Sequence, residues 1–156
     1  MRVRLYREGD AATMAALFHR SVETIGPRHY APAQVAAWAT RTPAPEALHT
    51  RATDGRVMLV AADEADQPVA FGDLEADGHI DLLYCAPEAA GSGLVGILYA
   101  TLEAIARERG VPRLYSEASE AALRFFVKRG FTMLHRRDLM IGDVPIHNYA
   151  VEKRLT

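Results

Sequence analysis

The sequence predicts a single domain of the mixed α/β class, with helices on both faces of a sheet. The chain has 156 residues, of which 49% are hydrophobic and 24% are charged, a balance that suits one folded core. Short apolar runs alternate with longer amphipathic stretches. No repeat, linker or low-complexity tract interrupts their order, so we expect one domain over residues 1–156.

The N-terminal third predicts one strand followed by helices. Residues 2–6 alternate polar and apolar side chains, as a strand does. Asp10 is the expected N-cap of an amphipathic helix that extends to residue 25. A second helix is expected to begin near Pro32, because proline suits a first helical turn. A third, short helix is expected over 45–53.

The middle of the chain predicts a three-stranded meander. Its strands are expected at 57–63, 68–76 and 79–86, and Asp77-Gly78 is a strong hairpin signal between the last two. The third run, HIDLLYCA, is almost continuously apolar apart from Asp81. That composition predicts a central strand.

The C-terminal part continues the alternation of helices and strands. Gly110 and Pro112 are expected to end a helix that begins at residue 93. The expected elements are a helix over 93–109, a strand over 113–119, a helix over 120–129, and two strands, 131–141 and 144–154, joined around Gly142-Asp143.

Composition excludes several classes of function. The net charge is −2 without a basic stripe, so nucleic acid is not an expected partner. Cys85 is the only cysteine, and the six histidines show no metal-ligand spacing, so no disulfide and no metal are expected. No signal peptide and no apolar run of ~20 residues are present, which predicts a cytoplasmic protein without a membrane partner. A homodimer through an edge strand stays open.

Three glycines, Gly91, Gly93 and Gly96, lie between the third meander strand and the next helix. Such a loop can leave unpaired N–H groups at a helix start, which suits a phosphate or pyrophosphate. The alternative is that the glycines only permit a tight turn. The spacing also matches a dinucleotide fingerprint formally, but a meander precedes it and Glu117 lies inside a strand, so that interpretation is poor.

The glycine loop and a second motif together resemble the GNAT superfamily of acyl-CoA-dependent N-acyltransferases. The family signature is Gln/Arg-x-x-Gly-x-Gly/Ala after a central strand, and its loop amides hold the CoA pyrophosphate. The stretch 90–95 carries the central Gly93 of that signature. Ala90 stands where the family has Gln or Arg, and Val95 stands where it has Gly or Ala.

The second motif is SEAALRFFVKRGF, residues 119–131. It resembles the family's Asn-x-x-Ala-x-x-Phe-Tyr-x-x-x-Gly-Phe helix, which lies beside the pantetheine arm. Ser119 stands in place of the frequent Asn, and Phe126 stands in place of the tyrosine that protonates the leaving thiolate. The matching residues are Ala122, Phe125, Gly130 and Phe131.

The resemblance implies a site between two splayed parallel strands, HIDLLYCA and RLYSEAS. Backbone N–H groups freed by the splay would bind the cofactor and polarise its acyl carbonyl. Acetyl-CoA is the implied co-substrate. The implied cofactor-binding residues are Leu83, Tyr84, Cys85, Gly91, Ser92, Gly93, Leu94, Val95, Gly96, Ser119, Ala122, Phe125 and Phe126.

Acyl transfer to an amine needs a group that accepts a proton. Asp81 is the first candidate, because acetylating members of the superfamily carry a catalytic Glu four residues before a Cys-Ala pair, here Cys85-Ala86. Burial in the apolar strand would raise the pKa of Asp81, although a buried structural ion pair is an equal alternative. Glu117 is the second candidate. Asp73 and Glu75 are further carboxylates that could reach the cleft.

Phe126 cannot donate a proton to the leaving thiolate. Tyr84 or Tyr149 could replace the missing acid, or the thiolate could leave unassisted, since its thiol has a pKa of about 8.5. Cys85 is a nucleophile candidate only in principle, because a small buried residue is the simpler interpretation.

The acceptor side is expected to come from the N-terminal helices and the last hairpin. His29, Tyr30, Trp38 and Asn148, with Asp143, are the candidate acceptor-binding residues, and core packing is the alternative for the aromatic ones. The expected function is N-acetylation of a primary amine of a small molecule or peptide by direct attack. The competing hypothesis is a non-catalytic acyl-CoA-binding or regulatory domain.

Overall fold

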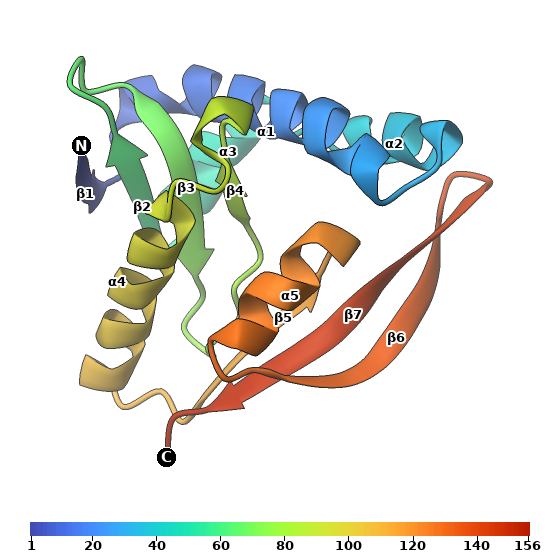
Figure 1. Cartoon of the computed structure of the whole chain (residues 1–156). Helices are drawn as coiled ribbons and strands as arrows, with labels where there is room; N and C mark the ends of the chain where they lie inside the picture. Colours follow the sequence, from blue (N-terminus) through green and yellow to red (C-terminus); the bar gives the residue numbers. More distant parts are fainter.

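The structure is a computed structural model that describes residues 1–156, and its strands form two sheets that diverge from one another (Figure 1). Three short 3₁₀ turns lie at Glu8–Asp10, Gly26–Arg28 and Pro87–Ala89. The other elements in order are β1 (Arg2–Leu5), α1 (Ala11–Ile25), α2 (Pro32–Ala39), α3 (Pro45–Ala52), β2 (Val57–Ala62), β3 (Pro68–Leu74), β4 (Leu83–Cys85), α4 (Leu94–Glu108), β5 (Arg113–Ala118), α5 (Glu120–Lys128), β6 (Thr132–Ile141) and β7 (Val144–Arg154).

The two sheets meet where the segment before β4 approaches β5. The first sheet has the order β1-β2-β3-β4 and the second β5-β7-β6, and all pairs within them are antiparallel. A single parallel bridge joins His79 to Tyr115, and the Ile80 N–H donates to the Tyr115 carbonyl at 2.9 Å. Beyond it the strands separate, so the predicted splay is present.

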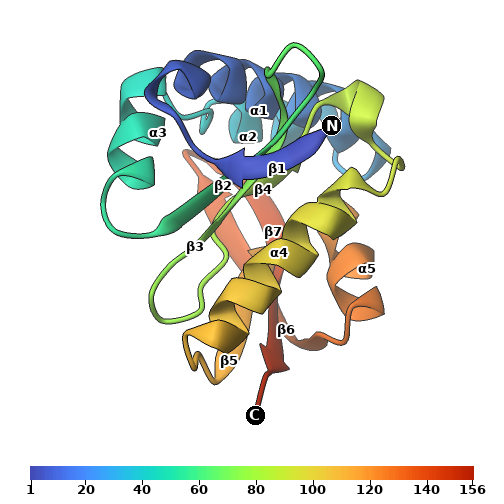
Figure 2. The ribbon, with the colours of Figure 1, turned by 90° about the vertical axis from the view of Figure 1, so that its left-hand side faces the viewer.

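Helices cover both faces, as the sequence predicts. α4 and α5 pack on one face around a core that includes Leu98, Leu102 and Phe126. α1, α2 and α3 cover the other face around a second core that includes Leu17 and Leu48. Figure 2 shows α4 crossing in front of the strands, with α1 to α3 behind and above it. None of the helices combines the length and the apolar composition needed to cross a bilayer.

The expectation of a continuous central strand over 79–86 is wrong, because only Leu83–Cys85 is regular strand and it ends its own sheet. The reason is Asp73 on β3, whose side chain is fully buried. Its Oδ1 accepts the backbone N–H groups of Asp81 and Leu82, each at 2.8 Å. The carboxylate thus takes the place of ladder hydrogen bonds and distorts the segment just before β4.

Two local predictions at turns have different outcomes. Asp10 precedes α1, but its side chain makes no capping bond; it accepts hydrogen bonds from Arg4 at 2.8 and 3.0 Å and from the Arg7 N–H. The turn at Gly78 is confirmed, with φ of 97°. A Cβ at Gly78 would lie 1.9 Å from the Arg113 carbonyl oxygen, so only glycine lets this turn approach β5.

Candidate functional site

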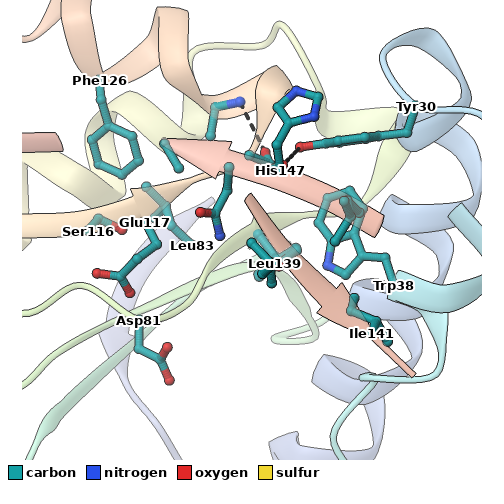
Figure 3. Close-up of a pocket in the computed structure, with 16 residues that line it drawn as sticks. Tyr30, Trp38, Asp81, Leu83, Ser116, Glu117, Phe126, Leu139, Ile141 and His147 are labelled. Atoms are coloured by element: carbon teal, nitrogen blue, oxygen red, sulfur yellow. Dashed lines mark hydrogen bonds between the residues drawn. The ribbon is translucent and has the colours of Figure 1, made fainter. Parts of the chain in front are cut away.

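A cavity of about 170 Å³ lies where β4 and β5 separate (Figure 3). Its walls come from five parts of the chain: the α1–α2 region, the β4 segment, the end of β5, the start of α5, and the β6–β7 hairpin. Ten of its sixteen lining residues are hydrophobic, so the few polar groups stand out against an apolar wall. Such a cavity with convergent polar groups is the ordinary form of a small-molecule site.

The backbone of β4 directs two N–H groups into this opening. The Asp73 N–H donates to the Leu82 carbonyl, and the Ala86 N–H donates to the Val69 carbonyl. Because an antiparallel ladder alternates, the Tyr84 N–H faces β3 and its partner residue, Phe71. The N–H groups of Leu83 and Cys85 therefore face away from β3, towards β5. Of the three amides expected at the reacting carbonyl, those of Leu83 and Cys85 face this opening, and that of Tyr84 does not.

Two carboxylates, Asp81 and Glu117, lie at one end of the cavity (Figure 3). Asp81 is about one-third exposed and accepts a hydrogen bond from Arg51 at 2.8 Å, so the expected burial of Asp81 is wrong. Glu117 is equally exposed and contacts His79 Nε2 at 2.7 Å. This hydrogen bond lowers the pKa of Glu117, against burial, which raises it.

His79 links Glu117 to Glu75 on the loop after β3. Its Nδ1 lies 2.9 Å from Glu75, and its ring stacks on Tyr115. The hydrogen bond to Glu117 raises the pKa of His79 to about 9, burial opposes this, and Glu75 adds to it. His79 is therefore an imidazolium at neutral pH, and it fixes one Glu117 oxygen in place.

The same cluster contains three potential metal-ligand atoms, from His79, Asp81 and Glu117, that lie within 4.8 Å of one another. Sequence spacing could not reveal this group, because His79 and Asp81 belong to one segment and Glu117 comes from β5. Both ring nitrogens of His79 already contact carboxylates, and Asp81 is paired with Arg51. A metal ion would have to displace one of these partners.

Asp73 and Glu75, the further carboxylates that could have reached the cleft, do not line the cavity. Asp73 is buried behind the β4 segment, where its Oδ2 accepts a hydrogen bond from Arg56 at 2.9 Å. Burial raises the pKa of Asp73 to about 6, while the Leu82 N–H and Arg56 lower it. The role of Asp73 is structural, since its carboxylate accepts the backbone N–H groups of Asp81 and Leu82.

The loop of residues 91–96 forms the start of α4 beside this opening. Gly91 and Gly93 have φ of 77° and 85°, and a Cβ on either would meet no atom within 4 Å. The N–H groups of Gly93, Val95 and Gly96 donate no hydrogen bond within the chain. Leu94 turns its side chain into the core, so it offers only backbone. This open, donor-rich cradle fits a phosphate or pyrophosphate group.

The start of α5 supplies the next wall of the cavity. Ser119 is the N-cap of α5, and its Oγ accepts the Ala122 N–H at 3.2 Å. Ser119, Ala122 and Phe126 line the cavity. Phe126 is buried and carries no hydroxyl, whereas Phe125 lies outside the cavity against Arg129 and Tyr99.

Of the candidate acceptor-binding residues, three line the cavity and two do not. Tyr30, Trp38 and Asn148 line the cavity. His29 is exposed outside it, because the turn before α2 directs it to solvent, and Asp143 lies exposed at the hairpin tip.

Tyr30 links several parts of the chain that form one wall of the cavity. Its hydroxyl donates to the His147 carbonyl at 2.9 Å and accepts the Glu120 N–H at 2.9 Å. Glu120 in turn contacts the His147 ring at 2.5 Å and accepts a hydrogen bond from Tyr149. The network joins the N-terminal half of the chain to α5 and β7, and so holds one wall of the cavity.

The remaining candidates for proton donation or nucleophilic attack are poorly placed. Tyr149 does not line the cavity, and its hydrogen bond to Glu120 raises its pKa. Tyr84 lines the cavity, but its ring packs against Phe18 at 4.2 Å, and burial raises its pKa far above the ordinary range. Cys85 is buried, and burial also raises the pKa of its thiol.

Sequence reasoning missed several lining residues, of which His147 is the most polar. His147 precedes Asn148 on β7 and carried no motif of its own. The only indication in the sequence was that His147 lies next to Asn148, a predicted acceptor-binding residue. The apolar wall residues Leu139, Ile141 and Ile146 were also missed, because a strand pattern does not say which face of a hairpin meets a cavity.

Comparison with known proteins gives a consistent set of relatives. A family model described as "Acetyltransferase (GNAT) domain" matches residues 27–152. A solved structure from Rhodopseudomonas palustris, described as "GCN5-Related N-acetyltransferase: Aminotransferase, Class-II", superposes with a TM-score of 0.89. It is 32% identical, and the match covers 99% of this chain and 95% of that one.

Two further relatives extend the comparison. The protein "Uncharacterized N-acetyltransferase YafP" of Escherichia coli K12 is 29% identical over 131 residues, which are 84% of this chain and 81% of the relative. The PaiA N-acetyltransferase from Thermoplasma acidophilum, solved in complex with coenzyme A, has a TM-score of 0.78 at 18% identity. That match covers 98% of each chain, and at this identity it shows the fold alone.

Proposed function

Because the chain belongs to the GNAT acetyltransferase family, we propose that it transfers an acetyl group from acetyl-CoA to a primary amine by direct attack. The acceptor is a small molecule or the amine of a peptide. The observation that carries this proposal is the cavity between the separating strands β4 and β5, with free N–H groups on one wall and two carboxylates at one end.

The start of α4 is the proposed binding site for the phosphates of CoA. Its support is the open space at Gly91 and Gly93 and the unpaired N–H groups of the first helical turn. Relatives solved with coenzyme A or with acetyl-CoA, the latter including yncA from Salmonella typhimurium, share this fold. From the loop, the pantetheine arm would follow the opening between β4 and α5.

The N–H groups of Leu83 and Cys85 are the proposed partners of the arm and of the acyl carbonyl. Hydrogen bonds from preorganised N–H groups stabilise the negative charge that develops on the carbonyl oxygen as the amine attacks. Such donors act strongly here because the surrounding wall is mostly apolar, which keeps water away.

The carboxylate pair Asp81 and Glu117 is the proposed acceptor of the amine proton. An ionised carboxylate attracts the ammonium form of the substrate. It can also take a proton from the nitrogen as the new bond forms, because the nitrogen then becomes a much stronger acid. His79 and Arg51 each hold one oxygen of the pair, which leaves the other oxygens available. The thiolate leaves without a tyrosine acid, since Phe126 occupies that place.

The experiment is an acceptor screen in which the release of CoA thiol from acetyl-CoA is measured over a panel of primary amines. With an acceptor in hand, Asp81→Asn and Glu117→Gln are compared. The variant that removes the base should lower kcat/KM by ~10²–10⁴-fold, with a smaller loss at high pH, where more amine is already neutral. Glu108→Gln, at an exposed site on α4, is the control and should have no effect.

The competing proposal is a non-catalytic acyl-CoA-binding domain, which the buried Phe126 and the absence of a motif Gln or Arg at Ala90 favour. It predicts saturable binding of acetyl-CoA without thiol release for any amine. Full activity in both Asp81→Asn and Glu117→Gln would contradict the proposed role of the carboxylate pair.

A further inference from the structure

Arg129 lies directly over the first turn of α4, although it belongs to the end of α5. A Cβ at Gly96 would lie 2.5 Å from Arg129 Nη2, closer than any side chain tolerates. Gly96 is the third residue of α4, so its missing Cβ leaves the space that the guanidinium fills. The two positions are 33 residues apart in sequence (129 minus 96), and no motif connects them.

The guanidinium is held in this position by its own helix. Its Cζ lies 3.6 Å from the centre of the Phe125 ring, and Nη1 donates to the Phe125 carbonyl at 3.2 Å. Stacking on an aromatic ring and binding to a carbonyl at a helix C-terminus both favour a cation. These contacts engage one face of the guanidinium and its Nη1 atom. Its Nη2 atom lies next to Gly96.

No carboxylate of the chain lies within ion-pair distance of Arg129, whereas Arg107 on α4 and Lys153 on β7 both pair with Glu103. A cation at a helix N-terminus is disfavoured, because the first turn carries a partial positive charge. The end of α5 offsets only part of this. Free N–H groups and an unpaired guanidinium at the same place therefore suit an anion from outside the chain.

We propose that Arg129 binds the diphosphate of CoA, together with the N–H groups of Gly93, Val95 and Gly96. This inference rests on the proposed function, because it concerns the same cofactor site. The family signature places a Gln or Arg at the position of Ala90, and this chain has no polar side chain there. Arg129 supplies the missing cation from α5, and Gly96 makes the space for it. A guanidinium suits this ligand because its fork can bind two phosphate oxygens.

The test measures the affinity for CoA by isothermal titration calorimetry in the wild type, Arg129→Gln and Gly96→Ala. Arg129→Gln should weaken binding about tenfold, as expected for the loss of one charge-assisted contact at a partly exposed site. Gly96→Ala should weaken it similarly by displacing the guanidinium, although alanine favours the helix and should keep or raise the Tm. Arg109→Gln, at the exposed far end of α4, is the matched control and should bind like the wild type.

The double variant Gly96→Ala/Arg129→Gln tests whether Gly96 acts through Arg129. The two effects should not add, so the double variant should bind about as well as Arg129→Gln alone. Full additivity would overturn the proposed coupling between the two positions.

Dephospho-CoA, which lacks the 3′-phosphate, distinguishes the two phosphate groups of the ligand. Arg129→Gln should lose the same factor with CoA and with dephospho-CoA. A loss seen with CoA alone would assign Arg129 to the 3′-phosphate and overturn the proposal. Wild-type affinity in Arg129→Gln would also overturn it while leaving the proposed function standing. Absence of CoA binding in the wild type would instead refute the proposed function, and this inference with it.

Discussion

Asp73 determines the shape of the strand opening, and replacing it by alanine and by asparagine tests that role. The buried carboxylate accepts the N–H groups of Asp81 and Leu82 through one oxygen, and Arg56 through the other. Alanine removes all three interactions. Asparagine keeps an oxygen that can accept both N–H groups, and it removes the charge. The comparison between the two variants isolates the backbone contacts.

The expected magnitude follows from these contacts. Each buried N–H left without a partner costs about 1–3 kcal/mol. For the pair of N–H groups held by Asp73, we expect Asp73→Ala to be less stable than Asp73→Asn by about 2–6 kcal/mol. Arg56 keeps Asp54 and Glu75 as partners in both variants. A loss of this size is a large part of the 5–15 kcal/mol typical of a domain.

The pH dependence gives a second, independent readout of Asp73. Burial raises the pKa of Asp73 from its ordinary value of 3.8 to about 6 in the folded chain. As the pH rises, the Asp73 carboxyl therefore loses its proton at a lower pH in the unfolded chain than in the folded chain. The free energy of unfolding consequently falls between about pH 4 and pH 6. The contribution is ~3 kcal/mol, from a shift of about two units at ~1.4 kcal/mol each. Asp73→Asn should lack this fall.

Urea unfolding followed by circular dichroism measures the free energy of unfolding of all three proteins. Hydrogen exchange at the Leu82 amide should also become faster in Asp73→Ala and stay slow in Asp73→Asn. Equal stability of Asp73→Ala and Asp73→Asn, with an unchanged exchange rate at Leu82, would refute the role of this carboxylate in holding the backbone before β4.

Three further predictions concern the loop, the missing acid and the imidazolium. Gly93→Asp should abolish the rise in Tm that acetyl-CoA causes, because it places a negative charge in the open loop at the start of α4. Gly55→Asp, also at positive φ and in open space, is the control and should retain the rise. A rise retained in both variants would contradict the loop assignment. Phe126→Tyr should fold and give equal or higher turnover in a thiol-release assay; a large fall in turnover at unchanged Tm would show that Phe126 shapes the acyl site instead. The pKa of His79 is about 9 in the folded chain and exceeds the ordinary value of 6.5. The contribution of His79 to stability is therefore complete below about pH 6.5 and is lost as the pH rises through 9. Urea midpoints across this range should fall more in the wild type than in His79→Gln, and equal falls would contradict the role of these ion pairs.

Local patterns in the sequence were sufficient for most elements. The amphipathic periods of α1 and α4 and the turn residues around the meander placed the elements to within a few positions. The failure at residues 79–86 has a tertiary cause. Asp73 lies six positions upstream, in a strand that reads as ordinary, and nothing local shows that its carboxylate would replace the ladder bonds of the next strand.

The site was predictable where a motif carried it and not where the fold assembled it. The motifs located the loop at Gly93 and the wall at Ser119. They could not show that Asp81 is exposed and paired with Arg51, because that contact crosses from α3 to the β4 segment. Nor could they show that Arg129 reaches the first turn of α4, since that contact joins the end of one helix to the start of another.

We propose above all that acyl-CoA enters the opening where β4 and β5 separate. The most direct measurement is a titration of isotope-labelled protein with acetyl-CoA, followed through the backbone amide resonances. The account predicts saturable shifts at Leu83, Cys85, Gly93 and Ser119, with little change on the outer face of α3. Absence of any shift at millimolar acetyl-CoA, or shifts confined to surfaces away from these residues, would contradict it.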